Sequence, residues 1–246
     1  MRNIKITVEY DGSRYSGWQR LGRDESTNTV ENKLLEVIQK MVGRDIELNC
    51  GCRTESGGHA YAQVANFKSN IALKPYEIKN YLNRFLPMDI AVTDVTDMPE
   101  RFHASLNAKS KTFIYRIAVG DAPSVFTRKY TYYCFDPLDL KAMEKAGAHL
   151  LGKHDFKIFS TVKKSKSTVK EVYSLDFITT ENEIQIKIRA NDFLHNMAQM
   201  IAATLIEVGL HKLDSDEVAA IFNKDSALVA TPSADSKGLF LSNIEY

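Results

Sequence analysis

A carboxylate beside two glycines is the first feature of this sequence that is suited to chemistry. Glu55 stands in the stretch CRTESGGHAYAQVANF, residues 52–67, with Arg53 and His59 close by. The glycines let the backbone turn, and an alternating apolar pattern typical of a strand follows directly. Loops between strands often display binding or catalytic groups. We therefore interpret Glu55 as a candidate catalytic carboxylate, with Arg53 and His59 in the same site.

A second stretch, YDGSRYSGWQ at residues 10–19, is a loop interrupted by two glycines. Tyr10, Asp11 and Gln19 are its candidate contacts to a phosphate or a base. The alternative interpretation is a turn that packs beneath the only tryptophan of the chain.

A third stretch, RFHASLNAKSKTFIYRI at residues 101–117, interleaves cations with aromatic side chains. RNA is bound by phosphate contacts and by base stacking, so this composition suits it. Arg101, His103 and Phe113 are the candidate substrate contacts. Period-two alternation predicts that about half of the stretch is sheet core.

The fourth stretch, RANDFLHNMAQMIAATLIEVG at residues 189–209, is the end of a strand followed by a helix. Its apolar face carries Phe193 and Met197. Its first turn presents polar side chains, including Asp192 and Gln199, which we expect to face a cleft.

These stretches need a scaffold, and hydrophobic periodicity predicts one. The first half contains, in order, a strand around 4–8, a helix at 29–42, strands at 44–50 and 61–67, a helix between Pro75 and Pro87, and a strand at 89–95. Asn28 and Glu31 fit a capping box for the first helix. The second half contains a strand at 112–119, helices at 138–151, 194–209 and 215–223, a hairpin of 168–179 with 183–190, and a closing strand at 238–246.

Each half therefore has the order β-α-β-β-α-β. This indicates an α+β fold with two similar halves, residues 1–104 and 105–246, whose mixed or antiparallel sheets surround a central cleft. The first half carries the loop of Glu55, and the second completes the cleft. Periodicity alone does not show how the two sheets join.

Bulk composition limits the classes of function. The chain has 246 residues, of which 44% are apolar and 26% are charged, as in a globular protein. The sequence contains no run of eighteen apolar residues, so it predicts no membrane span. The net charge of +1 does not by itself predict a nucleic-acid partner, although separated charges can still bind one. The densest basic run, KKSKSTVK at residues 163–170, is interpreted as a solvated loop.

The cysteines and histidines argue against a metal or a disulfide framework. Three cysteines, Cys50, Cys52 and Cys134, include no C-x-x-C pair. The histidines of the second half lack metal-ligand spacing. We therefore expect no metal and a reducing, cytoplasmic location.

Taken together, the four stretches resemble the TruA-type tRNA pseudouridine synthases. The motifs YDG…GWQ and RT-x-x-G-x-HA occur in this order, and the likeness extends from Tyr10 to the final GLFLSNIEY. The resemblance implies the pseudouridine synthase fold, a homodimer and a structured RNA partner. It also implies isomerisation of uridine in the anticodon arm of tRNA, without metal or cofactor.

Three positions of the site depart from the family pattern. The loop of the family reads Arg-Thr-Asp with a catalytic aspartate, and here that position holds Glu55. A tyrosine of the family stands against the target base, and here it is Phe113. An arginine of the family pairs with the aspartate, and here it is Gln199. In addition, Ser105 follows FHA where the family has an arginine.

These departures leave three hypotheses open. The protein is an RNA pseudouridine synthase that uses Glu55, with weak, altered or absent activity on the usual tRNA. Alternatively, it is a non-catalytic paralogue that binds RNA. The third hypothesis is a protein-interaction module, to which the near-neutral charge gives some weight.

Overall fold

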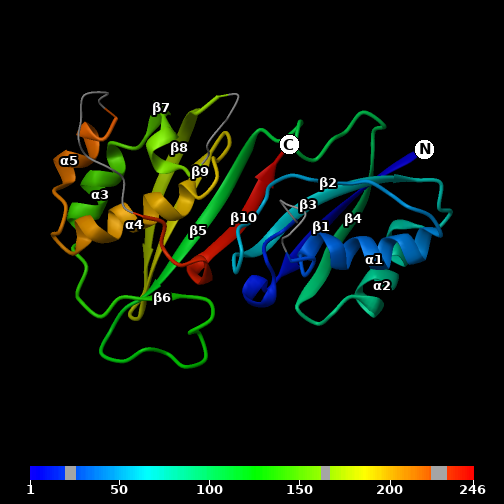
Figure 1. The fold of residues 1–246 in the computed structure, drawn as a ribbon, viewed down its shortest axis with the longest axis horizontal. Coiled ribbons are helices and arrows are strands. Elements are labelled where there is room, and N and C mark those ends of the chain that lie inside the picture. Colours follow the sequence, from blue (N-terminus) through cyan, green and yellow to red (C-terminus); the bar gives the residue numbers. More distant parts are fainter. Residues whose placement is uncertain (20–25, 162–166, 223–231) are drawn as a thin grey trace. The chain divides into compact units, whose positions relative to one another are not determined.

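The computed structural model describes residues 1–19, 26–161, 167–222 and 232–246. It contains two compact units, one of Met1–Lys109 with Phe240–Tyr246 and the other of Ser110–Leu239. Both units combine sheet strands with helices, so the predicted α+β class is confirmed (Figure 1). None of the helices in the described ranges has the length and hydropathy that a membrane span requires.

The sheet of the first unit is organised around its longest strand. The elements of this unit are β1 (Arg2–Tyr10), α1 (Val30–Val42), β2 (Leu48–Cys50), β3 (His59–Ser69), α2 (Pro75–Phe85), β4 (Ile90–Met98) and β10 (Leu239–Glu245). β1 pairs antiparallel with both β3 and β4. The other edge of β3 is shared, because β2 pairs antiparallel near Phe67 and β10 pairs parallel near His59. The last strand of the chain thus returns to its first unit.

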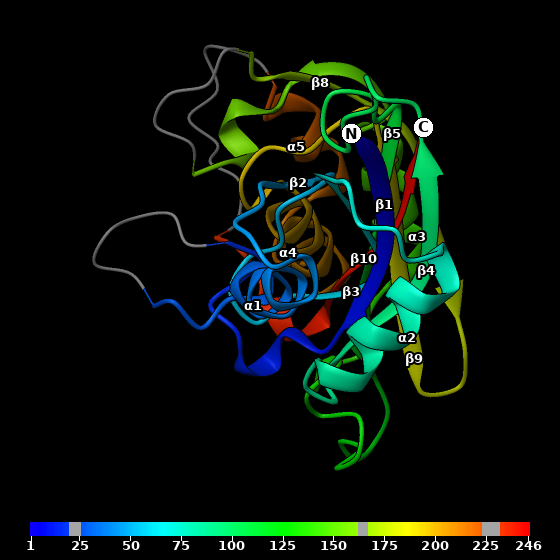
Figure 2. The same ribbon diagram turned by 90° about the vertical axis from the view of Figure 1, so that its right-hand side faces the viewer.

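Hydrophobic burial explains why these segments form the first unit. Ile4, Ile6 and Val8 alternate along β1 and are fully buried. In Figure 2, α1 lies to one side of β1. Leu34 and Ile38, four residues apart on α1, are also fully buried. The predicted strand and helix are confirmed here, because both periodicities match the observed burial.

The predicted capping box at the start of α1 is wrong. Thr29 is the N-cap residue, and its side chain accepts a hydrogen bond from the backbone N–H of Asn32. The side chain of Asn28 instead donates to the carbonyl oxygen of Arg14. A tertiary contact therefore takes the side chain that the local pattern assigned to the cap.

The second unit forms an antiparallel sheet with a buried helix. Its elements are β5 (Ser110–Ala118), β6 (Tyr132–Tyr133), α3 (Leu140–Ala148), β7 (Gly152–Asp155), β8 (Val169–Thr179), β9 (Glu183–Ala190), α4 (Met197–Gly209) and α5 (Ser215–Ala220). The strand order is β5-β9-β8-β7, and β6 pairs parallel with β5. The predicted hairpin is confirmed as β8 and β9. Figure 1 shows α3, α4 and α5 gathered beside β8 and β9.

The helix α4 is buried on nearly all sides, since Glu207 is its only residue outside the buried class. The predicted helix at 194–209 begins only at Met197, because Asn196 adopts a left-handed conformation with φ 62°. The helix predicted at 215–223 ends at Ala220, and its last predicted residue lies outside the described ranges. The short strands β6 and β7 were not predicted.

Candidate active site

The loop that carries Glu55 is a tight turn between β2 and β3. The backbone N–H of Gly58 donates to the carbonyl oxygen of Glu55 at 3.0 Å, and Gly57 has a φ of 80°. That left-handed conformation is one that glycine adopts without strain. Arg53 is exposed, Glu55 is half-buried and Thr54 between them is buried. The turn therefore presents the two charged side chains and anchors itself through the residue between them.

The segment 10–18 holds this loop in place. The backbone N–H of Trp18 donates to the carbonyl oxygen of Thr54 at 3.0 Å, and that of Gly57 donates to Tyr15 at 3.2 Å. The hydroxyl groups of Tyr10 and Thr54 share a hydrogen bond of 2.7 Å. Tyr10 is buried, and this burial raises the pKa of its phenol, so the hydroxyl stays protonated. The motif YDG…GW thus builds the frame of the loop.

Two glycines make this close contact possible. A Cβ atom on Gly12 would lie 1.8 Å from the carbonyl oxygen of Gly58, and one on Gly17 would lie 2.7 Å from that of Thr54. Gly17 also has a φ of 86°. Both positions need a residue without a side chain, because the obstructing atoms belong to the backbone.

His59 and Asp11 lie beneath the loop. The Nδ1 atom of His59 accepts the backbone N–H of Gly12 at 3.1 Å and lies 3.3 Å from Oδ1 of Asp11. The imidazole stacks on Phe240 of β10 with ring centroids 4.6 Å apart, and it is only 1% exposed. Asp11 also accepts from the backbone and hydroxyl of Ser13. These contacts make His59 and Asp11 part of the support under the loop.

Glu31 is a residue near the loop that the sequence analysis assigned only to a helix cap. Its backbone N–H donates to the carbonyl oxygen of Trp18 at 2.8 Å, next to the contact between Trp18 and Thr54. Burial raises the pKa of the Glu31 carboxyl, and the nearby charge of Arg53 opposes that shift. No local pattern could reveal this electrostatic interaction, because the fold alone brings Arg53 near Glu31.

The second unit holds Phe113 and Gln199. Phe113 on β5 is 4% exposed and packs edge-to-face against Phe193, with ring centroids 4.9 Å apart. Gln199 on α4 is 3% exposed, and its Nε2 donates to the carbonyl oxygen of Ala234 and to Oγ of Ser236. Among the described residues, its Oε1 atom has no hydrogen-bond partner. The amide therefore anchors the segment that leads to β10.

A cluster of three charges supports the loop between β9 and α4. Asp192 pairs with Lys111 at 2.6 Å and with Lys170 at 2.7 Å. The two lysines come from β5 and β8, so the carboxylate links two strands to the segment that carries Phe193. Lys170 is thus an ion-pair partner, whereas the rest of the basic run, Lys163, Lys164 and Lys166, lies outside the described residues.

We expect Asp192→Asn to destabilise the protein by about 1–2 kcal/mol at pH 7, because each lysine loses a charged partner. Partial burial raises the pKa of the Asp192 carboxyl, but Lys111 and Lys170 outweigh it and hold the pKa below its usual range. A lowered pKa gives stability that is complete above the unfolded value of about 4 and is lost as the pH falls through the folded value.

The measurement is urea unfolding of both proteins between pH 7 and pH 3. The difference in unfolding free energy should be constant from pH 7 to about pH 5 and shrink below about pH 4. Asp176→Asn, at an exposed position on β8, is the matched control and should change stability by less than about 0.5 kcal/mol. A difference that persists unchanged at pH 3 would contradict the ion-pair explanation.

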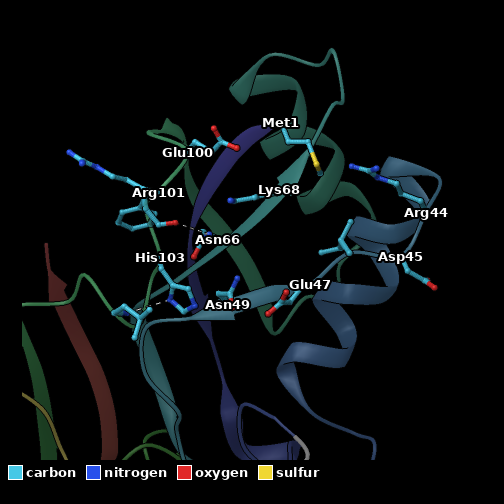
Figure 3. Close-up of a pocket in the computed structure, with 13 residues that line it drawn as sticks. Met1, Arg44, Asp45, Glu47, Asn49, Asn66, Lys68, Glu100, Arg101 and His103 are labelled. Atoms are coloured by element: carbon cyan, nitrogen blue, oxygen red, sulfur yellow. Dashed lines mark hydrogen bonds between the residues drawn. The ribbon is translucent and has the colours of Figure 1, made fainter.

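Among the remaining predicted site residues, Gln19 directly follows Trp18, whose backbone contacts the loop, whereas Arg101 and His103 line a separate pocket. Gln19 is half-buried and is the last described residue of its segment. Arg101 and His103 line a pocket that also includes Lys68, near the far end of β3 (Figure 3). His59 begins β3 beside the loop, and Lys68 follows nine residues later. At about 3.3 Å per residue, Lys68 lies roughly 30 Å along the strand from His59, whereas the near wall of the pocket, at Asn49, is only six residues before Glu55.

The chain is similar over its full length to known proteins. The family model described as tRNA pseudouridine synthase matches residues 146–246. The chain is 44% identical to tRNA pseudouridine synthase A 2 of Bacillus cereus, with all of both chains covered. It is 40% identical to tRNA pseudouridine synthase A 1 of Clostridium tetani, also over all of both chains. A solved H/ACA ribonucleoprotein with substrate RNA aligns over 97% of this chain and 57% of its own, at 8% identity and a TM-score of 0.35, which is too distant to add to these matches.

Sequence identity over the full length thus defines an α+β protein of the pseudouridine synthase fold. The chain belongs to the TruA-type tRNA pseudouridine synthase family.

Proposed function

We propose that this protein isomerises uridine to pseudouridine in the anticodon arm of tRNA and that Glu55 supplies the essential carboxylate. The observation that supports this most is the rigid frame of the loop. Gly12 and Gly17 approach the backbone of the loop so closely that the turn has little freedom. A catalytic carboxylate needs such a fixed position, since a displacement of about 1 Å can cost about a hundredfold in rate.

The reaction moves the glycosidic bond of C1′ from N1 to C5 of the base. The N1–C1′ bond breaks, the uracil turns over, and a C5–C1′ bond forms. The proton on C5 is then lost to solvent while N1 gains one, so no oxidant or co-substrate is needed. In this proposal Glu55 acts on the ribose as nucleophile or base, and Arg53 holds the extruded nucleotide. Phe113 stacks on the uracil ring, a role that needs no hydroxyl.

We further propose that this protein turns over more slowly than is usual for its family. Glu55 is one methylene longer than the aspartate of the family pattern, which adds a rotor and moves its oxygens. Gln199 carries no charge, so it cannot replace an arginine as a bidentate partner of a carboxylate. In this proposal residues 1–104 supply the carboxylate, residues 105–246 supply the stacking side chain, and the protein works as a homodimer in the cytoplasm.

The test is tritium release from tRNA labelled at C5 of uridine, because forming the C5–C1′ bond expels that tritium. We expect release from the anticodon arm, at a measurable but slow rate. Release confined to other parts of the tRNA would overturn the assignment of the anticodon arm. No release from any tRNA, with tRNA binding retained, would overturn the proposed activity.

That last outcome would support the second candidate function, in which the protein binds RNA without catalysing a reaction. One observation favours it, namely the use of the Gln199 amide to anchor Ala234 and Ser236. A side chain with this structural task is not available as a catalytic partner. A steep salt dependence of binding without any turnover would support this candidate.

A further inference from the structure

The pocket that contains Arg101 and His103 is large enough for a nucleotide. Its volume is about 560 Å³, within the range of about 300–1,000 Å³ that is typical of small-molecule sites. Its walls come from several segments of the first unit: the connection between α1 and β2, the strands β2 and β3, and the chain after β4 (Figure 3). Since all of these segments belong to one unit, the pocket does not depend on the second.

The lining mixes hydrogen-bond donors and acceptors. Lys68 extends across the pocket from β3, and Asn49 and Glu47 stand below it on the side of β2 (Figure 3). Arg101 lies on the opposite side, and its guanidinium points outward, away from Lys68 (Figure 3). Three cations and three carboxylates line the pocket in all, which are Arg44, Lys68, Arg101, Asp45, Glu47 and Glu100. This balance of charge does not favour a purely anionic ligand.

Asn66 and His103 make the floor and one wall rigid. The side chain of Asn66 is buried, donates to Oδ1 of Asn3 and accepts from the backbone N–H of Ala104. Nδ1 of His103 accepts the backbone N–H of Ser105 at 3.2 Å. A neutral imidazole whose Nδ1 accepts carries its proton on Nε2, which is then a donor. Rigid walls reduce the entropy that is lost when a ligand binds.

We propose that this pocket binds an unpaired ribonucleotide of the substrate RNA, distinct from the target uridine. Asn49 and Glu47 contact the hydrogen-bonding edge of the base, and Lys68 contacts its phosphate, with Arg101 at the outer rim adding long-range attraction for the RNA backbone. An RNA base carries donors and acceptors on the same edge, which a mixed lining matches better than a single charge does. Nine residues of β3 separate His59, beside the loop of Glu55, from Lys68, so the nucleotide in this pocket is a different one from the nucleotide at Glu55.

This inference rests on RNA as the substrate, but it does not require turnover. The test compares Lys68→Gln/Arg101→Gln with a control, Lys40→Gln/Arg84→Gln, whose two exposed cations lie on α1 and α2 outside the pocket. Binding of full-length tRNA is measured by fluorescence anisotropy at several salt concentrations. We expect the pocket variant to bind about tenfold more weakly and to lower the salt slope by about one, and the control to bind within about twofold of the wild type.

A second variant separates base contact from phosphate contact. Asn49→Ala should weaken tRNA binding by about tenfold without changing the salt slope, because it removes only neutral hydrogen bonds. Where tritium release is measurable, KM should rise in the pocket variant while kcat stays unchanged.

Three results would overturn the proposal. One is unchanged tRNA binding in both pocket variants. Another is equal weakening by the pocket and control pairs, which would indicate only nonspecific charge attraction. The third is tight binding of AMP, GMP, CMP or UMP that is lost in Lys68→Gln/Arg101→Gln while the binding of tRNA is unchanged. That result would assign the pocket to a free nucleotide. If tRNA binds with these effects but no tritium is released, the proposed activity fails and the pocket assignment stands.

Discussion

Glu55→Gln is expected to reduce tritium release from uridine C5 by about three orders of magnitude and to leave tRNA affinity within about threefold. Glutamine matches the size of glutamate but can act neither as a base nor as a nucleophile, and such groups contribute typically about 10²–10⁴-fold. The turn itself should persist, because hydrogen bonds between backbone groups and between the hydroxyl groups of Tyr10 and Thr54 hold it. The measurement is the initial rate at saturating tRNA, alongside binding by anisotropy.

The matched control for this change is Glu36→Gln, at an exposed position on α1. It makes the same chemical change away from the loop and should leave the rate within about twofold. A Glu55→Gln protein that keeps a third or more of the wild-type rate would show that another group performs the chemistry. Loss of rate together with loss of tRNA binding would instead point to a disturbed loop.

Gly12→Ala is expected to lower the free energy of unfolding by about 3–5 kcal/mol and to abolish most of the activity. The new Cβ would lie 1.8 Å from the carbonyl oxygen of Gly58 and 2.6 Å from its carbon. Overpacking usually costs about 1–3 kcal/mol, and this site lies above that range because both obstructing atoms are backbone. Either segment must shift, and the bond from Gly12 to His59 would break with it.

Gly43→Ala provides the comparison, because Gly43 ends α1 with a φ of 75° and a Cβ there would meet nothing within 4 Å. It should cost only about 1–2 kcal/mol for the left-handed backbone and leave the activity unchanged. Urea unfolding of the two variants measures the difference. Equal destabilisation by both changes would contradict the close approach of Gly12 to the loop.

The sequence predicted a turn around Glu55, which the structure confirms, but it did not predict which residues hold that turn. Tyr10, Asp11 and His59 were predicted to contact the substrate, a role that stays a prediction. In the structure they support the turn, because the backbone of residues 10–18 lies directly against it. The sequence shows that the two motifs are polar and contain glycines. It does not show that one packs against the other.

Arg101 and His103 illustrate a second limit. Their composition suggested RNA, and they were predicted to contact the substrate, which stays a prediction. In the structure they line a pocket with Lys68, which lies roughly 30 Å along β3 from His59. Strand pairing fixes that distance, and a one-residue change of register would alter which side chains share a face.

The sequence by itself determined the α+β class, the helices and the β8–β9 hairpin, because these depend on local periodicity of burial. The sequence also determined the family, since the order of the motifs can be recognised without knowledge of the fold. Only the tertiary structure decided that Thr29 caps α1, that β10 returns to β3, that Glu31 lies near Arg53 and that Gln199 anchors Ala234. Each of these depends on contacts between residues far apart in the chain. Such contacts form where packing and hydrogen bonding of the whole unit are satisfied, and no short window of sequence contains that information.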